Sequence, residues 1–442
     1  MTRAALIAAL AACALPAAAQ DLLQVYRDAQ KYDAVYSAAR FTLEAGREKL
    51  PQARAGLLPQ LDATGTATRS RIESDSRASS PANPGTLIYP NSSGYNLTLT
   101  QPLYRPAAAV AYDQAEFQVR QAEATFGQAS QDLAVRVAQA YFDVLTAQDS
   151  LELVGAQKAA ISEQLAQAKR NFEVGTATIT DTHEAQARYD LVVAQEIAAN
   201  SELDNRRRSL QAITGKEYER LTPLRSDVRL SPPNPAGMQS WVDLAEKQSY
   251  PVQVQQAATE VAQREMRRTA DGHWPTLDLV GRHGQNRDSG SVTSPVGRDS
   301  NTASISLELK LPLFAGGSVS SREREAEALY NKARDDLLSA RRTAALDAQR
   351  NYLSVVNGIA QVGALEQALI SSQSALDSNR LGYEVGVRIN IDVLNAQQQL
   401  FQTRRDLATA RYNTITSHLR LKAAAGSLRD EDIEEVNRAL AP

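Results

Sequence analysis

The side chains that most often carry out catalysis or bind metals are few and scattered in this chain. Its histidines show no metal-ligand spacing, and Gly215-Lys216 lacks the preceding glycine of a phosphate-binding loop. No serine, histidine and aspartate form the pattern of a catalytic triad. We therefore expect that the protein is not an enzyme and has neither a metal site nor a cofactor. The histidines are His183, His273, His283 and His418.

Polar and charged residues gather instead at two turns that nearly repeat each other. Residues 171–181 read NFEVGTATITD and residues 382–392 read GYEVGVRINID. Gly175 and Gly386 occupy the same place in the two turns, 211 positions apart. A glycine after a helical pattern favours a left-handed C-cap, so each is expected to end a long helix.

The aspartates that close the two turns have a simple structural interpretation as well. Asp181 and Asp392 precede helical patterns and favour N-caps, and Asp181-Thr-His-Glu184 has the spacing of a capping box. Capping and a functional role of these residues are compatible, so both interpretations stay open at this point.

The two turns belong to a chain that is a duplication. At an offset of 211, Ala140-Tyr141 matches Asn351-Tyr352, and at 216, Pro59-Gln-Leu61-Asp62 matches Pro275-Thr-Leu277-Asp278. The offset changes only where loops can absorb insertions. The predicted units are residues 20–239 and 240–442, each far longer than a solenoid repeat.

Each unit is predicted to hold the same elements in the same order. A helical tract comes first, then a β-hairpin, a very long helical tract, the glycine turn, and a return helix. In the first unit these are Asp21 to Gly56, residues 57–105, Pro106 to Phe172, and Asp181 to Thr214. In the second they are Trp241 to Gly272, residues 274–314, Ser318 to Leu381, and Asp392 to Ala425.

The hairpins carry alternating patterns. From Ala303 to Leu313 every odd position is apolar and almost every even one is polar, which predicts a strand with one apolar and one polar face. Strands of about ten such residues suit a tilted membrane span. Tyr104, Trp274 and Phe314 fall where strands meet helices, so they are either an interfacial aromatic girdle or ordinary core residues.

The lengths of the helical tracts predict a rod. At 1.5 Å per residue, a tract of about 65 residues spans roughly 100 Å, and one of about 35 residues spans roughly 50 Å. Two short helices end to end therefore match one long helix, with strands at one end of the rod and turns at the other. Four strands per chain cannot close into a barrel, but three chains would pool twelve.

The N-terminus and the composition narrow the class further. Arg3, the apolar run from Leu6 to Leu15 and Ala17-Ala18-Ala19 predict a signal peptide over residues 1–19. The alternative is lipidation of Cys13 in Leu10-Ala11-Ala12-Cys13. With 48 Lys and Arg against 51 Asp and Glu, the chain has no basic excess for nucleic acid. No stretch of 18 consecutive apolar residues follows, so no transmembrane helix is expected.

These features together resemble the TolC family of outer-membrane export channels. The resemblance rests on Asp21-Leu-Leu-Gln-Val-Tyr26-Arg-Asp-Ala29, Leu58-Pro59-Gln60-Leu61, the strand end at Tyr104, Ala140-Tyr141-Phe142 and the paired Val-Gly turns. It covers nearly the whole mature chain and both halves.

The resemblance implies a mainly α fold with a β-barrel portion. That fold is a homotrimer whose twelve-stranded barrel lies in outer-membrane lipid of a Gram-negative cell, with four strands from each chain. A long periplasmic α-helical coiled-coil barrel continues it. An equatorial belt would include residues 216–239 and the tail after Gly426, and the short tail predicts a reduced belt.

The implied function is a passive exit duct of a tripartite efflux or type I secretion system. Its partners are a periplasmic adaptor protein and an inner-membrane pump or ABC transporter, with the adaptor expected at Gly175 and Gly386. The sequence does not choose between drugs and secreted proteins as cargo. The alternative class is a periplasmic coiled-coil spacer of the cell envelope, which has no use for alternating strands.

The resemblance also implies a gate at the turns. Tyr383 and Arg388 correspond to gate residues that bond to Asp181 and to neighbouring Thr180. Asp392 corresponds to a position that lines the entrance as a three-fold acidic ring, which attracts cations. The family often has a second acid three positions on, where this chain has Asn395. We therefore expect a weaker entrance field and a weaker block by multivalent cations.

Overall fold

The computed structural model describes residues 20–74, 86–225, 228–290 and 296–441. The expected signal peptide and Cys13 lie outside these residues. The chain forms two compact units, which differ from the two sequence repeats. Among the described residues, the first compact unit contains 20–42, 123–254 and 338–441, and the second contains 43–122 and 255–337. Each unit therefore draws on both halves of the sequence.

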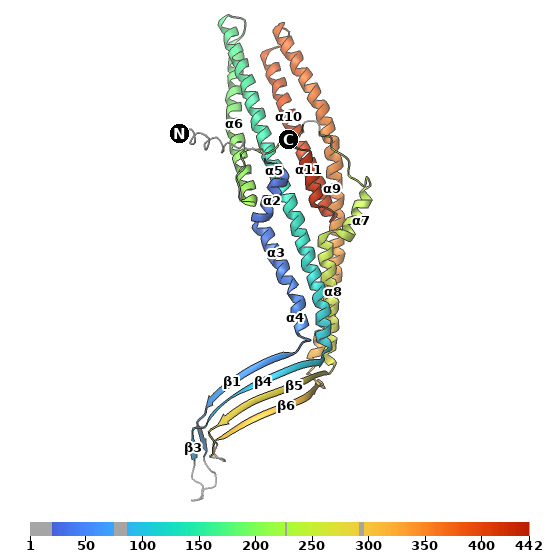
Figure 1. The fold of residues 1–442 in the computed structure, drawn as a ribbon. Helices are drawn as coiled ribbons and strands as arrows, with labels where there is room; N and C mark the ends of the chain where they lie inside the picture. The colour runs from blue at the N-terminus through green and yellow to red at the C-terminus, as the bar shows by residue number, and fades with distance from the viewer. Residues whose placement is uncertain (1–19, 75–85, 226–227, 291–295, 442) are drawn as a thin grey trace, which may run out of the picture. The chain divides into compact units, whose positions relative to one another are not determined.

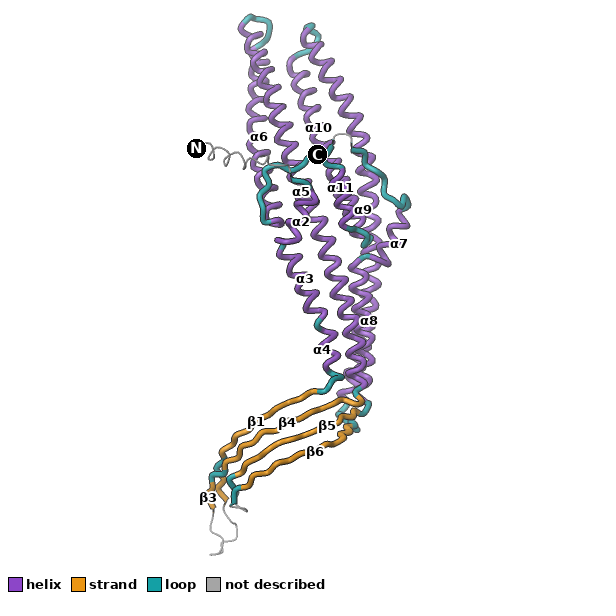
Figure 2. The backbone as a smooth tube through the Cα atoms, viewed as in Figure 1, coloured by secondary structure: helices purple, strands orange, loops and turns teal. Residues whose placement is uncertain are grey.

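Two long helices and two return helices form most of the first unit (Figures 1 and 2). Both predicted long tracts and both return helices are confirmed, each within a few residues of its expected ends. The long helices are α5 (Pro106–Glu173) and α9 (Ser318–Glu384), of 68 and 67 residues, and the return helices are α6 (Ile179–Thr214) and α10 (Asn390–Ala424).

The two shorter helical tracts are interrupted, where the sequence predicted single helices. Asp33 ends one helix and begins the next, because its carboxylate accepts a hydrogen bond from the Tyr36 amide at 2.7 Å. In the second tract Ser249 takes an extended conformation just before Tyr250 and Pro251. The pieces are α2 (Leu22–Tyr32), α3 (Ala34–Arg47) and α4 (Lys49–Ala55), then α7 (Met238–Gln248) and α8 (Tyr250–Ala270) with a short 3₁₀ turn (Asp271–His273).

The core of the first unit lies between α2, α5 and α10. Phe142 stacks on Tyr412 with ring centroids 5.5 Å apart, and Tyr141 meets Phe142 edge-on. The Tyr141 hydroxyl donates to the carbonyl of Thr222 at 2.8 Å and so anchors the linker after α6 to the long helix. In the tail, α11 (Asp430–Arg438) packs by the buried Ile433, and Leu440 pairs with Leu224 of the linker.

The second unit contains a four-stranded antiparallel sheet with the order β1-β4-β5-β6 (Figure 1). Each sequence repeat supplies one hairpin, and β4 pairs with β5 to join them. One expected boundary is wrong: β6 ends at Lys310 rather than continuing to Leu313, and Pro312 has no amide hydrogen for a ladder. The strands are β1 (Gln60–Arg69), β4 (Asn91–Tyr104), β5 (Thr276–Asp288) and β6 (Arg298–Lys310), and β2 (Ile72–Ser74) pairs separately with β3 (Thr86–Ile88).

The register places most apolar residues of the four strands on one face. Leu61 pairs with Leu99, Leu99 with Gly281, and Gly281 with Ile305. The opposite face is mostly polar, with Thr98 and Thr100 on β4 and Ser304 and Ser306 on β6, and the buried Val280 of β5 is an apolar exception. The apolar face is uncovered in the single chain, and Ile305 is 83% exposed.

The aromatic residues at the ends of the strands are exposed too. Tyr104, Trp274 and Phe314 all rank among the exposed large apolar side chains, and Phe314 is 89% exposed. The alternative that they are ordinary core residues is therefore wrong.

One helix departs from the expectation that no helix could cross a membrane. By length and composition alone α9 is long and apolar enough over an 18-residue window, little of which is buried in the single chain. Its exposed apolar side chains include Leu353, Val356 and Ile370. The same helix also carries buried positions, such as Val355 against Trp241 and Leu421.

Candidate functional site at the helix tips

Both predicted glycine turns end their long helices in the same way. The Gly175 amide donates to the Phe172 carbonyl at 3.0 Å, and the Thr176 amide donates to the Asn171 carbonyl at 2.8 Å. The second turn repeats this pair of bonds from Gly386 and its successor. With φ of 77° at Gly175 and 79° at Gly386, these are Schellman motifs. The predicted left-handed C-caps are confirmed.

The predicted N-caps are wrong, because both return helices begin two residues earlier than expected. Thr178 is the N-cap of α6 and forms a capping box with Asp181. The box is therefore Thr178 to Asp181 and not Asp181 to Glu184. In α10 the N-cap is Ile389, which has no side-chain acceptor, and Asp392 lies in the first turn.

The four predicted gate residues lie at these tips, but they do not bond to one another within the chain. The Tyr383 hydroxyl accepts a hydrogen bond from Asn171 Nδ2 at 3.2 Å. Arg388 approaches Asp392 of its own tip, with Nη1 and Oδ2 3.7 Å apart. Among the described residues neither Tyr383 nor Arg388 bonds to Asp181, and Thr180 is exposed.

The reason for this difference is local. Oδ2 of Asp181 accepts from the Thr178 amide at 2.9 Å and from the Thr178 hydroxyl at 2.8 Å. The capping box thus engages one oxygen of the carboxylate that was expected to hold Tyr383. Arg388 has a carboxylate one helical turn away, at the i+4 position.

Polar contacts that the sequence did not suggest join the two helical hairpins. Gln164 of α5 donates to Asn390 Oδ1 of α10 at 2.9 Å. Arg188 of α6 donates to Asn395 Oδ1 at 2.9 Å and to Gln398 Oε1 at 2.6 Å. Asn395 was expected at the entrance, and Arg188 is the residue that holds it.

Apolar side chains pack beneath these contacts. Leu394 of α10 is buried against Ile161 and Leu165 of α5 and Val192 of α6. The Tyr383 ring packs beside the cluster of Leu376, Val393 and Leu400. Tyr383 therefore has an apolar contact on its own hairpin and a polar contact to the other.

Two amide side chains are buried in this packing without full hydrogen bonding. Asn390 and Gln397 are 2% and 1% exposed, and they lie seven residues apart on α10. Asn390 Nδ2 and Gln397 Oε1 have no partner among the described residues. A buried polar atom without a partner costs about 1–3 kcal/mol, so the packing of the hairpins is not at its most stable.

The outermost residues of the tips are apolar and exposed. Val174 and Ile179 in the first turn, and Val385, Val387 and Ile389 in the second, are uncovered, with Val387 79% exposed. Exposed apolar side chains grouped at one place are typical of surfaces that contact another protein.

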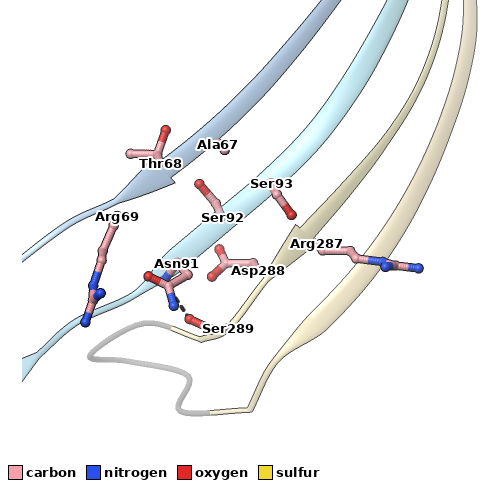
Figure 3. Close-up of a pocket in the computed structure, with 9 residues that line it drawn as sticks. All are labelled: Ala67, Thr68, Arg69, Asn91, Ser92, Ser93, Arg287, Asp288 and Ser289. Carbon is pink, nitrogen blue, oxygen red and sulfur yellow. Dashed lines mark hydrogen bonds between the residues drawn. The ribbon is translucent and has the colours of Figure 1, made fainter.

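A second polar place lies at the loop-bearing end of the sheet (Figure 3). Asn91 begins β4 there, and its amide donates to the Ser289 hydroxyl at 2.7 Å while the Ser289 amide donates to the Asn91 carbonyl at 2.9 Å. The site has no nucleophile and base pair, and its side chains are open to solvent. In the described part of the chain no three His, Cys, Asp or Glu residues are grouped to hold a metal.

The sequence contained partial signals for the contacts that it did not predict. Asn171 is the first residue of the repeated stretch, and Gly382 stands at the equivalent place in the second copy. The asymmetry marks Asn171 as a residue with a role in one tip only. Arg188 had no such signal, because its partners are side-chain amides on a helix about 200 positions away.

Comparisons with known proteins give a consistent result. The family model described as outer membrane efflux protein matches residues 17–216 and 241–427. The chain is 33% identical to the outer membrane protein TolC of Vibrio cholerae, over 96% of this chain and 94% of that protein. It is 32% identical to the proteases secretion protein PrtF of Dickeya chrysanthemi, over 95% and 91% of the two chains.

Solved structures share the fold at lower identity. The outer membrane protein VceC of Vibrio cholerae superposes with a TM-score of 0.75 at 19% identity, over 92% of this chain and 96% of that one. The open state of the MtrE outer membrane channel of Neisseria gonorrhoeae gives 0.71 at 18% identity, over 93% and 90%.

Proposed function

Because this chain belongs to the family of outer membrane efflux proteins, we propose that it is an exit duct whose entrance opens and closes at the helix tips. The protein is a non-enzymatic channel of the outer membrane that extends into the periplasm. It serves efflux or type I secretion, in a system with an adaptor and an inner-membrane pump. The observation that carries the gate is the meeting of the two hairpins at Tyr383 and Asn171.

The duct is a homotrimer in this proposal. Within one chain β1 and β6 each pair with one neighbour only, so the sheet has two open edges. Open edges are not tolerated in lipid, because every backbone group must be satisfied there. Closing three sheets edge to edge gives twelve strands, with the apolar face toward lipid and the hydroxyl-rich face toward the lumen.

The helices support assembly by the same reasoning. Leu353, Val356 and Ile370 of α9 are exposed in the single chain. In a tunnel of packed helices they bury against a neighbouring chain, which removes apolar area from water. A periplasmic spacer would explain the helices but leaves the exposed apolar face of the sheet without a use.

The adaptor contacts the tips around Gly175 and Gly386. Their Schellman turns project Val174, Val385 and Val387 into solvent, which is the apolar surface that such a contact would cover. Relatives include proteins named for secretion of proteases and for efflux. The cargo class of this chain therefore depends on the pump that it joins.

The gate consists of Thr180, Asp181, Tyr383 and Arg388, with Asp392 and Asn395 forming the constriction ring. Tyr383 links the two hairpins of one chain through Asn171, and Arg388 stands beside Asp392. The Tyr383–Asn171 hydrogen bond contributes about 1 kcal/mol and the exposed Arg388–Asp392 pair less than about 1 kcal/mol, a scale that an adaptor can overcome on docking.

Planar-bilayer recording of purified trimers tests this function. Tyr383→Phe and Arg388→Ser are each expected to raise single-channel conductance, and the double variant is expected to raise it most. Arg341→Ser, an exposed arginine elsewhere on α9, is the matched control and should leave conductance unchanged. Unchanged conductance in the double variant removes the gate assignment, and purely soluble monomers exclude the channel itself.

The cargo is tested separately. Deleting the gene and profiling both drug sensitivity and the secreted proteome distinguishes efflux from type I secretion. Increased drug sensitivity alone supports efflux, and loss of secreted proteins alone supports secretion.

A further inference from the structure

We infer that Arg188 is a further specificity-determining residue of the entrance, where its fixed positive charge offsets the attraction of Asp392 for multivalent cations. The inference rests on the proposed function, because it takes Asp392 and Asn395 to line the constriction. Asp392, Asn395 and Gln398 form a stripe on α10, and Arg188 of α6 contacts this stripe.

The contacts of Arg188 place it on that stripe. Its guanidinium donates to Asn395 Oδ1 at 2.9 Å and to Gln398 Oε1 at 2.6 Å. Asp392, Asn395 and Gln398 follow one another at intervals of three residues, so they share one face of α10. If that face lines the entrance, the guanidinium of Arg188 lines it as well.

The charge of Arg188 is not neutralised locally. Both of its acceptors are uncharged amides, and in the described part of the chain no carboxylate forms an ion pair with it. By contrast, Arg388 lies 3.7 Å from Asp392. An arginine stays protonated at every physiological pH, so the charge of Arg188 is constant.

The acids near Arg188 have to be counted with it. Asp181 and Glu184 precede it by seven and four positions on α6, and Asp392 lies three positions before its acceptor Asn395 on α10. Together with Arg188 and Arg388 these five groups carry one net negative charge in each chain. Neutralising Arg188 leaves two, so the net negative charge at the entrance of a trimer doubles.

Arg188 also has a defined relation to an acid at position 395. An aspartate there would meet a guanidinium already in place and form a charge-assisted pair with it. Asn395 fits this arrangement because its Oδ1 accepts the same hydrogen bond without a charge. The added aspartate would lower the net charge of each chain by one, as the loss of Arg188 does.

The test uses purified trimers in planar bilayers and hexaamminecobalt(III), an inert trivalent cation. The reversal potential in a potassium chloride gradient reports ion preference, and the current against cobalt concentration reports block. Arg188→Gln is expected to shift the reversal potential toward cation preference and to strengthen block at least about tenfold, since several unit charges act within one Debye length. Arg188→Lys should behave as the wild type.

A second variant tests whether the effect is electrostatic. Asn395→Asp adds one negative charge per chain, so it is expected to strengthen block about as much as Arg188→Gln, and the two substitutions together should strengthen it by about two such steps. Arg208→Gln, an exposed arginine farther along α6, is the matched control and should change neither readout. Heat-resistant trimers in gels verify that each variant assembles.

The outcomes separate the two proposals. Wild-type protein that forms no channels contradicts the proposed function. Channels in which Arg188→Gln and the wild type give the same reversal potential and the same block overturn the inference about Arg188 alone.

Discussion

The amide of Asn171 donates a hydrogen bond to the hydroxyl of Tyr383 over 3.2 Å, and so joins the end of one long helix to the end of the other. The two residues stand almost one repeat apart in the sequence. Tyr383 was expected to bond to Asp181, but that carboxylate forms a local capping box with Thr178 through its Oδ2. The partner of Tyr383 in the single chain is therefore an amide and not an acid.

A double-mutant cycle identifies the partner through which Tyr383 acts. Asn171→Ala and Tyr383→Phe each remove the same hydrogen bond, worth about 1 kcal/mol, so each should raise single-channel conductance. If the bond is the link, the double variant behaves like either single variant, because nothing further is lost. Bilayer recordings of the three variants and the wild type supply the comparison.

The same cycle with Asp181→Ala provides the contrary case. Additive effects of Asn171→Ala and Tyr383→Phe, together with non-additive effects of Asp181→Ala and Tyr383→Phe, would return the role of acceptor to Asp181. That result means that assembly or closure rearranges the capping box.

Replacing glycine by alanine is expected to have opposite effects on stability at Gly386, just after α9, and at Gly363, within α9. Gly386 has a φ of 79° and open space where a methyl group would project, so Gly386→Ala adds backbone strain of about 1 kcal/mol and no clash. Gly363 lies inside α9, also with open space, and Gly363→Ala should stabilise the helix by about 0.5–1 kcal/mol. Thermal unfolding of detergent-solubilised protein, followed by circular dichroism, gives both values.

Limited proteolysis adds a local readout to this pair. Gly386→Ala is expected to speed cleavage near the second tip, and Gly363→Ala should not. Equal effects of the two alanines on stability would show that the turn conformation at Gly386 is not under constraint.

Periodicity and repeats were sufficient to predict most elements of the fold. The odd-even pattern up to Leu309, the helical tracts of about 65 residues and the two glycine turns are all local signals, and the structure has each of them. The errors occur where a single residue competes with the pattern. Pro312 stops a strand that its neighbours would continue, and Asp33 breaks a helix by capping it.

The site was less predictable than the fold, for a physical reason. The positions of Tyr383 and Arg388 follow from the repeat, but their partners depend on which hydrogen bonds are satisfied first. Thr178 lies three residues from Asp181 and bonds to it at little entropic cost. A residue on another helix can bond to Asp181 only after the helices have packed together. Arg188 and Asn395 meet only in the packed structure, so no spacing in the sequence indicates them.

The partly buried carboxylate of Asp149 predicts a pH dependence of stability. Burial raises the pKa of Asp149 above the ordinary value of 3.8 despite the hydrogen bond from the Tyr412 hydroxyl, and nearby Glu152 raises it further. As pH rises from the ordinary pKa to the raised one, the unfolded chain loses a proton that the folded chain keeps. Asp149 therefore favours folding most at acid pH and least above its raised pKa.

In the wild type the Tyr412 hydroxyl donates to Asp149 Oδ2 at 2.7 Å. Asp149→Asn removes the pH dependence of stability, while the amide oxygen of the new side chain can still accept this hydrogen bond. The variant should unfold at a higher temperature than the wild type at pH 7.5, and the difference should shrink as pH falls toward 4. Asp377→Asn, an exposed aspartate on α9, serves as the control and should change little at either pH. A difference that stays constant with pH would contradict the assignment to Asp149.

The two faces of β6 predict opposite outcomes for one substitution at adjacent residues. Ile305 lies on the apolar face and is 83% exposed in the single chain, and Ser304 lies on the polar face. If the apolar face meets lipid, Ile305→Arg costs about 2–4 kcal/mol near the bilayer midplane, whereas Ser304→Arg faces an aqueous lumen and costs little. Ile305→Arg should therefore reduce the yield of heat-resistant trimers in outer-membrane fractions severalfold, and Ser304→Arg should leave the yield near that of the wild type while lowering cation current. Reduced yield in both variants would show that neither face meets an aqueous lumen. Reduced yield in Ser304→Arg alone would show that the polar face, and not the apolar face, meets lipid.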